Sequence, residues 1–291
     1  MLLPKLEYLA PKTGAELAGY LADHKGKAKI LAGGTDVVPN MLEKLYKADY
    51  LIDVNGIEEL QGISYAKGKG LTIGAATKLE DIERSKIVGD NYTALQKAAS
   101  EVGSPQIRAM ASLAGNSCNA SPAADTPPAL VALGAKVSIV SKSGKREMAL
   151  EDFIRGNRKT DLKPDEYVEK FILPDGLPNS ASRFGLLTLT AAKAIDVVSI
   201  AVSLAVDPGS KKVTAVQIAM GSVAPVPIRA KKGEKVLLNQ VIDDALIAKA
   251  AEACGGDAKP IDDIRGSAAY RQHVVKVLAN RTIKETLAAI G

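Results

Sequence analysis

The chain has 291 residues with 46% hydrophobic and 24% charged residues, an ordinary globular composition whose length favours two or three subdomains over a single core. The net charge of +5 is spread along the chain and only 4% of residues are aromatic, whereas a nucleic-acid-binding protein concentrates basic residues among aromatic ones, so no nucleic-acid partner is expected. The longest apolar stretches, such as 197–206, fall far short of the ~20 residues that cross a bilayer, so no membrane span is expected.

The first 55 residues have the pattern of a βαβ unit extended by one helix and one strand. We expect a strand near 6–8, a helix over 15–23 with Thr13 as its N-cap, a strand over 28–31, a helix over 37–43 and a strand over 50–54. The first nine residues include Pro4, Lys5 and Glu7 and lack the apolar core of a signal peptide. This pattern favours a cytoplasmic protein.

Residues 56–176 differ in character and are expected to form a second subdomain. We expect strands over 71–75 and 167–173, a hairpin of 136–140 with 146–150, and helices over 93–102 and 126–133. Thr77 and Glu80 have the spacing of a capping box. The stretch 104–124 is rich in Ser, Ala, Pro, Asn and Gly, and it is expected to be irregular.

Residues 177–291 are expected to form a separate α+β unit, because Pro174 and Pro178 interrupt the pattern just before it. Strands are expected over 184–190, 198–206 and 213–220, and helices over 241–254 and 267–288. The order favours a small antiparallel sheet that is followed by helices.

The residues that bind metals are few and far apart. The only cysteines are Cys118 and Cys254, and the only histidines are His24 and His273. A structural zinc ion or an iron–sulfur cluster needs about four such ligands, so no metal is expected in this chain. The spacing does not exclude a Ser-His-Asp or Cys-His site, but nothing in the sequence favours one, and no catalytic residue is assigned.

Two adjacent glycines, Gly33 and Gly34, separate the second expected strand from its helix. Glycines let a backbone approach a ligand closely, and successive N–H groups at such a junction can bind a pyrophosphate. Taken alone, the pattern is more often just a tight turn. A P-loop motif is absent, and the GxG-like sequence at 68–70 precedes a strand where a Rossmann fingerprint would follow one.

The second notable segment is the long stretch from Ser112 to Asp125. It combines small residues with hydrogen-bonding side chains and has no regular periodicity. The stretch could be a plain surface loop or a loop that wraps around a polar ligand. Ordered loops of this length are uncommon and tend to be functional.

Together these segments resemble the FAD subunit of the xanthine dehydrogenase and carbon monoxide dehydrogenase family. The motifs that carry the resemblance are AGGTD at 32–36, VGSPQIR at 102–108, SLAGN at 112–116, NASPAADTPPAL at 119–130, IAMGSVAPVPIR at 218–229 and a segment at 262–271 that ends in SAAYR. They occur in the family's order across nearly the whole chain. The resemblance is therefore specific.

The resemblance implies an α+β architecture: a two-subdomain FAD-binding fold of the vanillyl-alcohol-oxidase/PCMH type, and a C-terminal α+β domain of the CO dehydrogenase flavoprotein type. The implied limits are 1–55, 56–176 and 177–291. FAD would lie between the first two subdomains. The chain would receive electrons from 2Fe–2S clusters on a small partner subunit, after they leave a molybdenum cofactor in a large subunit, and pass them to NAD or another acceptor.

The resemblance also implies which residues contact FAD, with Asn116, Ser121 and Asp125 as the side-chain ligands. The full set expected in the site is Leu31, Ala32, Gly33, Gly34, Thr35, Asp36, Val102, Ser112, Ala114, Gly115, Asn116, Asn119, Ser121, Asp125, Val168 and Thr188. Two positions depart from the family, because Ala114 replaces a usual glycine and Thr188 a usual lysine. The alternatives are a self-contained FAD oxidase or reductase of the same fold, and a non-enzymatic nucleotide-binding subunit.

Overall fold

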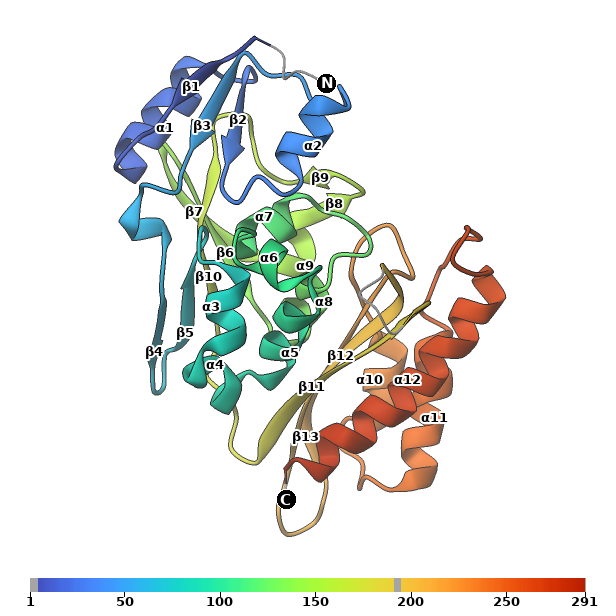
Figure 1. Ribbon diagram of the computed structural model, residues 1–291. Helices are drawn as coiled ribbons and strands as arrows, with labels where there is room; N and C mark the ends of the chain where they lie inside the picture. Colours follow the sequence, from blue (N-terminus) through green and yellow to red (C-terminus); the bar gives the residue numbers. More distant parts are fainter. Residues whose placement is uncertain (1–4, 191–194, 291) are drawn as a thin grey trace.

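The computed structural model describes residues 5–190 and 195–290. Three segments lie outside these ranges: residues 1–4 at the start of the expected first unit, residues 191–194, and residue 291 at the end of the expected third unit. The chain forms three lobes in sequence order, each built on its own sheet (Figure 1). No helix in the described ranges is long and apolar enough to cross a membrane.

The first lobe is a parallel three-stranded sheet in the order β1-β3-β2. Its elements are β1 (Glu7–Leu9), α1 (Gly14–Asp23), β2 (Ala28–Leu31), α2 (Val37–Leu42) and β3 (Tyr50–Asp53). The Thr13 side chain caps α1 as expected, since its Oγ1 accepts a hydrogen bond from the Glu16 N–H at 3.2 Å. Leu17 and Leu21 of α1 pack in one cluster with Ile52 of β3.

The second lobe is an antiparallel sheet in the order β4-β5-β10-β6-β7. Its strands are β4 (Ile63–Ala66), β5 (Gly70–Gly74), β6 (Lys136–Ser141), β7 (Gly144–Ala149) and β10 (Tyr167–Leu173), and a small hairpin joins β8 (Ile154–Gly156) to β9 (Lys159–Thr160). Its helices are η1 (Glu58–Leu60), α3 (Leu79–Arg84), α4 (Lys86–Asn91), α5 (Thr93–Glu101), α6 (Pro105–Arg108), α7 (Leu113–Cys118), α8 (Thr126–Ala132) and α9 (Leu150–Phe153).

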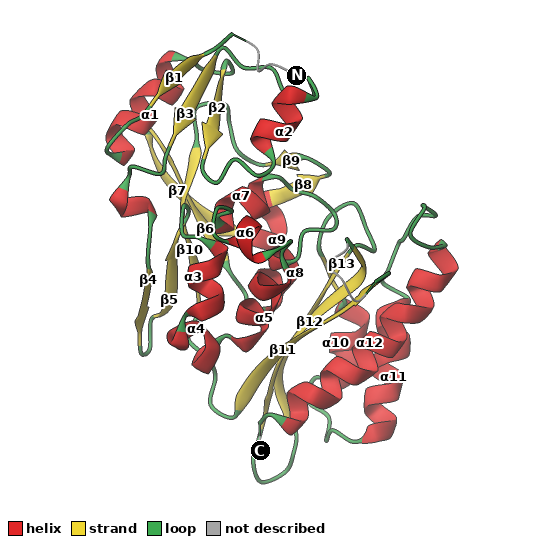
Figure 2. Ribbon diagram, viewed as in Figure 1, coloured by secondary structure: helices red, strands yellow, loops and turns green. Residues whose placement is uncertain are grey.

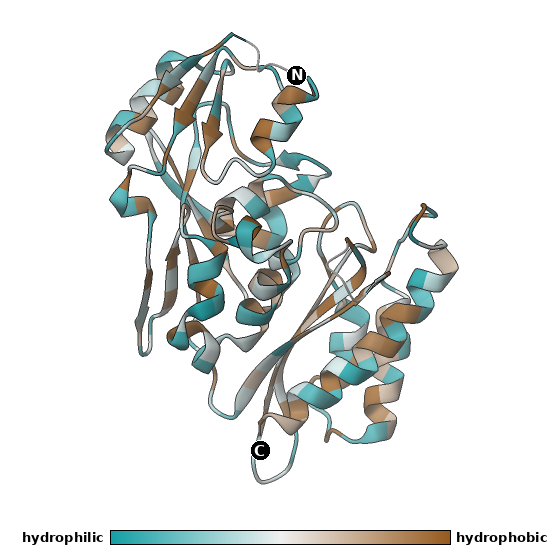
Figure 3. Ribbon diagram, viewed as in Figure 1, coloured by the Kyte–Doolittle hydropathy of each residue, from teal (hydrophilic) through white to brown (hydrophobic). Residues whose placement is uncertain are grey.

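The third lobe is an antiparallel sheet in the order β11-β12-β13-β14, with helices on one face (Figure 2). Its elements are β11 (Ser180–Thr188), β12 (Asp196–Val206), β13 (Val213–Gly221), β14 (Ile228–Arg229), α10 (Lys231–Leu237), α11 (Asp244–Gly255) and α12 (Ala268–Ala288). Hydrophobic and hydrophilic residues alternate along α12 (Figure 3). Its apolar residues recur at helical spacing, and Val275, Leu278 and Ile283 pack in one cluster with the sheet. On the other face, Ala201 and Ala219 join the core of the second lobe.

Two local expectations are wrong. Thr77 and Glu80 form no capping box, since α3 begins at Leu79 and the Thr77 hydroxyl donates to the carbonyl of Gly62 at 3.1 Å. The stretch 104–124 is also not wholly irregular. It contains α6 and α7, each of which begins after a serine whose Oγ accepts a backbone N–H three residues on. These helices are too short to show hydrophobic periodicity.

Candidate functional site

A cavity of about 570 Å³ lies between the first and second lobes. Three segments form most of its wall: the loop between β2 and α2, the start of α7, and the segment from Arg158 to Val168. One end is apolar and contains Leu17, Leu21, Val54 and Leu60. The middle is built from backbone and small polar side chains. The cavity therefore suits a ligand that has both an apolar part and a polar part.

The loop at residues 32–36 forms one side of the polar centre. A Cβ on Gly33 would overlap the carbonyl group of Met110, so the two backbones touch directly. Gly34 has φ +74°, a backbone conformation that residues other than glycine rarely adopt. No hydrogen bond within the described chain uses the backbone N–H groups of residues 33–36. Consecutive amides of this kind, facing a cavity, form an anion-binding nest.

The start of α7 forms the opposite side. Ser112 caps this helix through a 3.1 Å hydrogen bond from the Gly115 N–H, and the Ala114 N–H donates to the carbonyl of Ala75 at 3.0 Å. The Asn116 Oδ1 accepts a 2.6 Å hydrogen bond from the Thr126 hydroxyl. Among the described residues the Asn116 Nδ2 has no acceptor, so this amide is available as a donor to a ligand.

Most of the residues expected from the sequence meet around this one cavity. Those that line it are Ala32, Gly33, Gly34, Thr35, Asp36, Val102, Ser112, Ala114, Gly115, Asn116, Asn119 and Val168. Those outside its lining are Leu31, Ser121, Asp125 and Thr188. Leu31 lies beneath Gly34. Ser121 and Asp125 follow α7 toward the third lobe, and Thr188 ends β11, where its hydroxyl donates to the Thr190 carbonyl at 2.8 Å.

Several residues that line the cavity could not be predicted from the sequence. Tyr46 lies close to two cations, with Lys29 Nζ 4.8 Å and the Arg158 guanidinium 5.8 Å from its ring centre. Its hydroxyl donates to Asn119 Oδ1 at 3.5 Å, so it connects the first lobe to the second. Other lining residues that were not predicted include the wall that runs from Thr160 to Tyr167 and the apolar residues Leu17 and Leu60. No sequence motif marks them.

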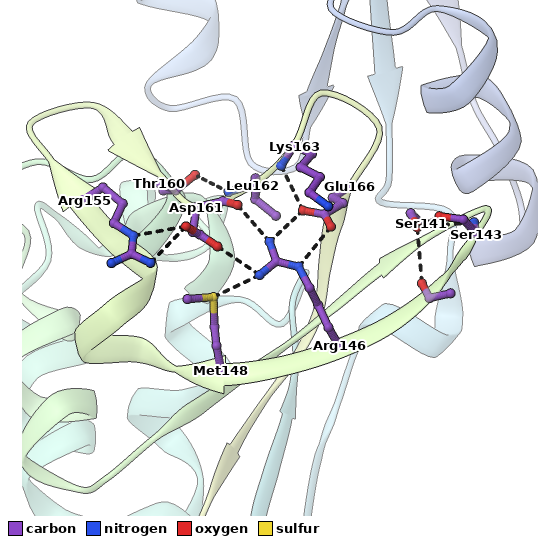
Figure 4. A network of polar contacts seen from close by, with 11 residues as sticks. Ser141, Ser143, Arg146, Met148, Arg155, Thr160, Asp161, Leu162, Lys163 and Glu166 are labelled. Atoms are coloured by element: carbon purple, nitrogen blue, oxygen red, sulfur yellow. Dashed lines mark hydrogen bonds and ion pairs between the residues drawn. The ribbon is translucent and has the colours of Figure 1, made fainter.

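The wall from Thr160 to Glu166 is held from behind by Arg146 of β7 (Figure 4). The guanidinium of Arg146 donates to both oxygens of Glu166, at 2.9 and 2.8 Å, and to Asp161 Oδ2 at 2.9 Å. This arrangement holds the pKa of the Glu166 carboxyl below its ordinary value. Glu166 is therefore an ionised, paired group on the cavity wall.

The remaining charges of the cavity are mixed in sign. Lys29, Arg158 and Lys163 line it together with Asp36. Burial raises the pKa of Asp36, and the nearby Arg158 partly offsets that rise. In the described part of the chain, no group of three or more His, Cys, Asp and Glu side chains could hold a metal ion.

Comparisons with known proteins identify the ligand class. Residues 4–176 match the family described as FAD binding domain in molybdopterin dehydrogenase, and 189–286 match the CO dehydrogenase flavoprotein C-terminal domain. The glyceraldehyde dehydrogenase medium chain of Sulfolobus acidocaldarius is 30% identical over 97% of this chain and 98% of that one. The xanthine dehydrogenase FAD-binding subunit of Escherichia coli O157:H7 is 30% identical, with 98% and 97% of the two chains covered. A chain of the carbon monoxide dehydrogenase structure from Hydrogenophaga pseudoflava matches with a TM-score of 0.93 at 28% identity over 99% of both chains.

The chain belongs to the FAD-binding family of the molybdopterin dehydrogenases. It is a flavoprotein subunit of the oxidoreductase class, and its cofactor is FAD. The family resemblance and the α+β fold class expected from the sequence are confirmed.

The cavity of this flavoprotein fits the cofactor on structural grounds. The four backbone N–H groups of residues 33–36 suit a pyrophosphate, and the absence of a Cβ on Gly33 lets this loop contact the backbone of Met110. The apolar end, with Leu17 and Leu60, suits a flat aromatic base. FAD carries both a pyrophosphate and aromatic ring systems, so it has a group for the polar part and a group for the apolar part of the cavity.

The flavin of this protein should be bound without a covalent link. Cys118 is the one cysteine that lines the cavity, and burial raises the pKa of its thiol to about 12, so the thiol is protonated and a poor nucleophile. Acid precipitation of the purified protein should therefore release all of the yellow colour into the supernatant. Flavin that stays in the washed pellet would contradict this expectation, and Cys118→Ala would then show whether Cys118 carries it.

Three motif arginines of this flavoprotein stabilise the structure outside the cavity lining. Arg108 of the VGSPQIR motif donates to the Val102 carbonyl at 3.2 Å and pairs with Glu83. Arg271 at the end of SAAYR donates to the carbonyls of Val197 and Ser222. Arg229, at the end of IAMGSVAPVPIR, pairs with Glu234. Each fixes a backbone segment by a charge-assisted hydrogen bond or ion pair.

Proposed function

We propose that this chain is the electron-transfer subunit of a molybdenum hydroxylase, with a large molybdenum-cofactor subunit and a small 2Fe–2S subunit as partners. Electrons would pass from the 2Fe–2S clusters through FAD to NAD or another acceptor. The observation that carries the proposal is similarity along nearly the whole of both chains to proteins named medium chain or FAD-binding subunit of a dehydrogenase. One similar structure is a Cu,Mo-CO dehydrogenase, and another is a carbon monoxide dehydrogenase that lacks the Mo-pyranopterin moiety of its molybdenum cofactor.

We propose that the pyrophosphate of FAD lies between residues 32–36 and 112–116, with the adenosine half in the apolar end of the cavity. The flavin ring would then lie toward Ser121 and Asp125, where the second lobe meets the third. The Ser222 N–H donates to the Pro122 carbonyl at 2.9 Å, which keeps this loop against β13 and supports that placement. Asn116 Nδ2 would donate to the cofactor. When bound, FAD accepts and releases electrons singly or in pairs.

We also propose the three units 1–55, 56–176 and 177–291 as the domains, and the cytoplasm as the compartment. In this scheme the chain supplies position and electrostatics, and the organic substrate is oxidised on another subunit. The scheme assigns no acid–base residue to this chain. A self-contained oxidase would need such a group near the flavin end.

The test of the proposal compares the chain alone with the chain co-expressed with the products of its neighbouring genes. We expect iron and molybdenum to co-purify with the second preparation only, and only that preparation to couple oxidation of an organic substrate to reduction of an acceptor. Both preparations should contain FAD, and reduction of a dye by NADH or another reductant provides the control for a functional flavin. Steady-state oxidation of an organic substrate by the chain alone would contradict the proposal and favour the self-contained oxidase.

A further inference from the structure

Arg146 is the most heavily hydrogen-bonded side chain near the cavity, although it lies behind the wall and does not line it (Figure 4). Besides its three bonds to Glu166 and Asp161 side chains, it donates to the backbone carbonyl of Asp161 at 2.8 Å. Its Nη1 also lies 3.4 Å from the sulfur of Met148. One guanidinium thus joins β7 to two points of a loop that is 15 to 20 residues farther along the chain.

Other contacts also anchor the loop that Arg146 holds. The Lys163 N–H donates to Glu166 Oε2 at 2.8 Å, so the carboxylate bound by Arg146 also closes the turn from inside. The Asp161 N–H donates to the Phe153 carbonyl at 2.9 Å. Between these anchors, Thr160, Leu162, Lys163 and Pro164 line the cavity. Two further cations pair with the loop, Arg155 with Asp161 at 3.0 Å and Lys25 with Asp165 at 2.9 Å. Among the described residues, Arg146 is the cation that pairs with the buried carboxylate of Glu166.

We propose that Arg146 is a positioning residue that shapes the adenosine end of the FAD cavity and thereby sets the preference for the dinucleotide over FMN. The inference rests on the proposed placement of FAD. The loop from Thr160 to Glu166 adjoins Tyr167 and Val168, which line the same cavity as Leu17 and Leu60. FMN has no adenosine half, so its binding does not depend on this wall.

Loss of Arg146 has a specific consequence for Glu166, which is only 8% exposed. A buried carboxylate that loses its cation is strongly destabilised, and it must either move toward water or take up a proton. Either change displaces the turn that Glu166 closes. Lysine cannot replace arginine fully, because an ammonium group lacks the planar fork that binds both oxygens of one carboxylate while reaching a second.

Arg155 provides a matched control. It also pairs with Asp161, with its Nη2 3.0 Å from Oδ1, but it makes no contact with Glu166 among the described residues, and its side chain is 52% exposed. Arg155→Met therefore removes one cation that pairs with the same loop and leaves the buried carboxylate of Glu166 paired with Arg146. Arg146→Met removes the pair at Glu166 as well. Both variants lose one positive charge. A difference in their FAD binding therefore reports on the ion pair at Glu166 and not on net charge.

The experiment uses the full chain stripped of FAD and measures binding of FAD directly, and of ADP and FMN by competition. Arg146→Met should weaken the binding of FAD and of ADP on the order of ten- to one-hundred-fold, and it should leave the affinity for FMN within about two-fold of the wild type. Arg146→Lys should show a smaller loss for ADP, and Arg155→Met should match the wild type. Unchanged ADP binding in Arg146→Met, or an equal loss of ADP and FMN, would overturn the inference. If Arg146→Met fails to fold, the ADP-to-FMN comparison in Arg146→Lys decides by the same criterion.

The variant Gly33→Ala separates this inference from the placement on which it rests. If Gly33→Ala weakens FAD while Arg146→Met does not, the placement stands and the role of Arg146 is wrong. If Gly33→Ala leaves FAD binding unchanged, the placement itself is wrong.

Discussion

Replacing Gly33 with alanine should remove FAD from the purified chain while the fold survives. The added methyl group would overlap the carbonyl of Met110 and lie 2.8 Å from the Cα of Ala111, which are backbone atoms and cannot rotate away. The Met110 carbonyl accepts a 3.1 Å hydrogen bond from Lys78 Nζ, and the Ala111 carbonyl accepts one from the Leu79 N–H at 2.9 Å. The two loops must therefore separate, which moves the amides of residues 33–36 away from the proposed position of the pyrophosphate.

Forced separation of packed segments costs about 1–3 kcal/mol, so FAD affinity should fall roughly ten- to one-hundred-fold or more. The measurement is the ratio of flavin to protein absorbance after purification, with circular dichroism to confirm the fold. Gly19→Ala is the control, because a Cβ at that position in α1 meets no atom within 4 Å. Full FAD occupancy in Gly33→Ala would show that the pyrophosphate lies elsewhere.

The elements that could be predicted from the sequence are those with a strong pattern of their own. The strand β10 occupies the predicted residues 167–173, and α12 lies within one residue of its predicted range. Both carry apolar residues at the period of their structure. By contrast, α6 and α7 depend on serine caps and on tertiary contacts, and short helices of this kind have no periodicity to detect.

The candidate site also has a part that the sequence predicts and a part that it does not. The glycine loop and the start of α7 could be predicted, because glycine pairs and runs of small polar residues report local backbone requirements. The wall from Thr160 to Glu166 could not be predicted, since ion pairs to residues distant in sequence, such as Arg146 and Lys25, hold it in place. Motifs also do not separate ligand contacts from anchors. Arg108 belongs to a motif of the family, yet it binds the backbone of Val102 and lies outside the lining of the cavity.

A second large effect is expected at Asp196, where Asp196→Asn should make the chain more stable than the wild type as pH rises. Asp196 begins β12 and is only 3% exposed. It faces the carboxyl of Asp125, and its Oδ2 lacks a hydrogen-bond partner within the described residues. Burial first, and the nearby Asp125 second, raise the pKa of Asp196 to about 8.

The direction of the effect follows from this shift. In the unfolded chain an aspartate ionises near pH ~3.9, whereas burial and the neighbouring Asp125 carboxyl raise the pKa of Asp196 in the folded chain well above that value. Between these values the folded state binds more protons than the unfolded state, so the contribution of this group to stability falls as pH rises. Asparagine is neutral throughout and removes this dependence. All other titratable groups are the same in both proteins, so their contributions cancel in the difference between the two free energies of unfolding.

The measurement is the free energy of unfolding in urea for both proteins, saturated equally with FAD, at about pH 5.5 and about pH 7.5. The stability of Asp196→Asn relative to the wild type should increase by on the order of 2 kcal/mol between the two conditions. Asp207→Asn provides a control, since Asp207 is an aspartate of the same lobe whose pKa is lowered by its hydrogen bonds to Ser210. Its effect should not grow in the same direction over this interval, because both its folded and unfolded forms are already ionised. A relative stability of Asp196→Asn that stays constant or falls with pH would show that Asp196 is ionised in the folded chain, and that a cation compensates its charge.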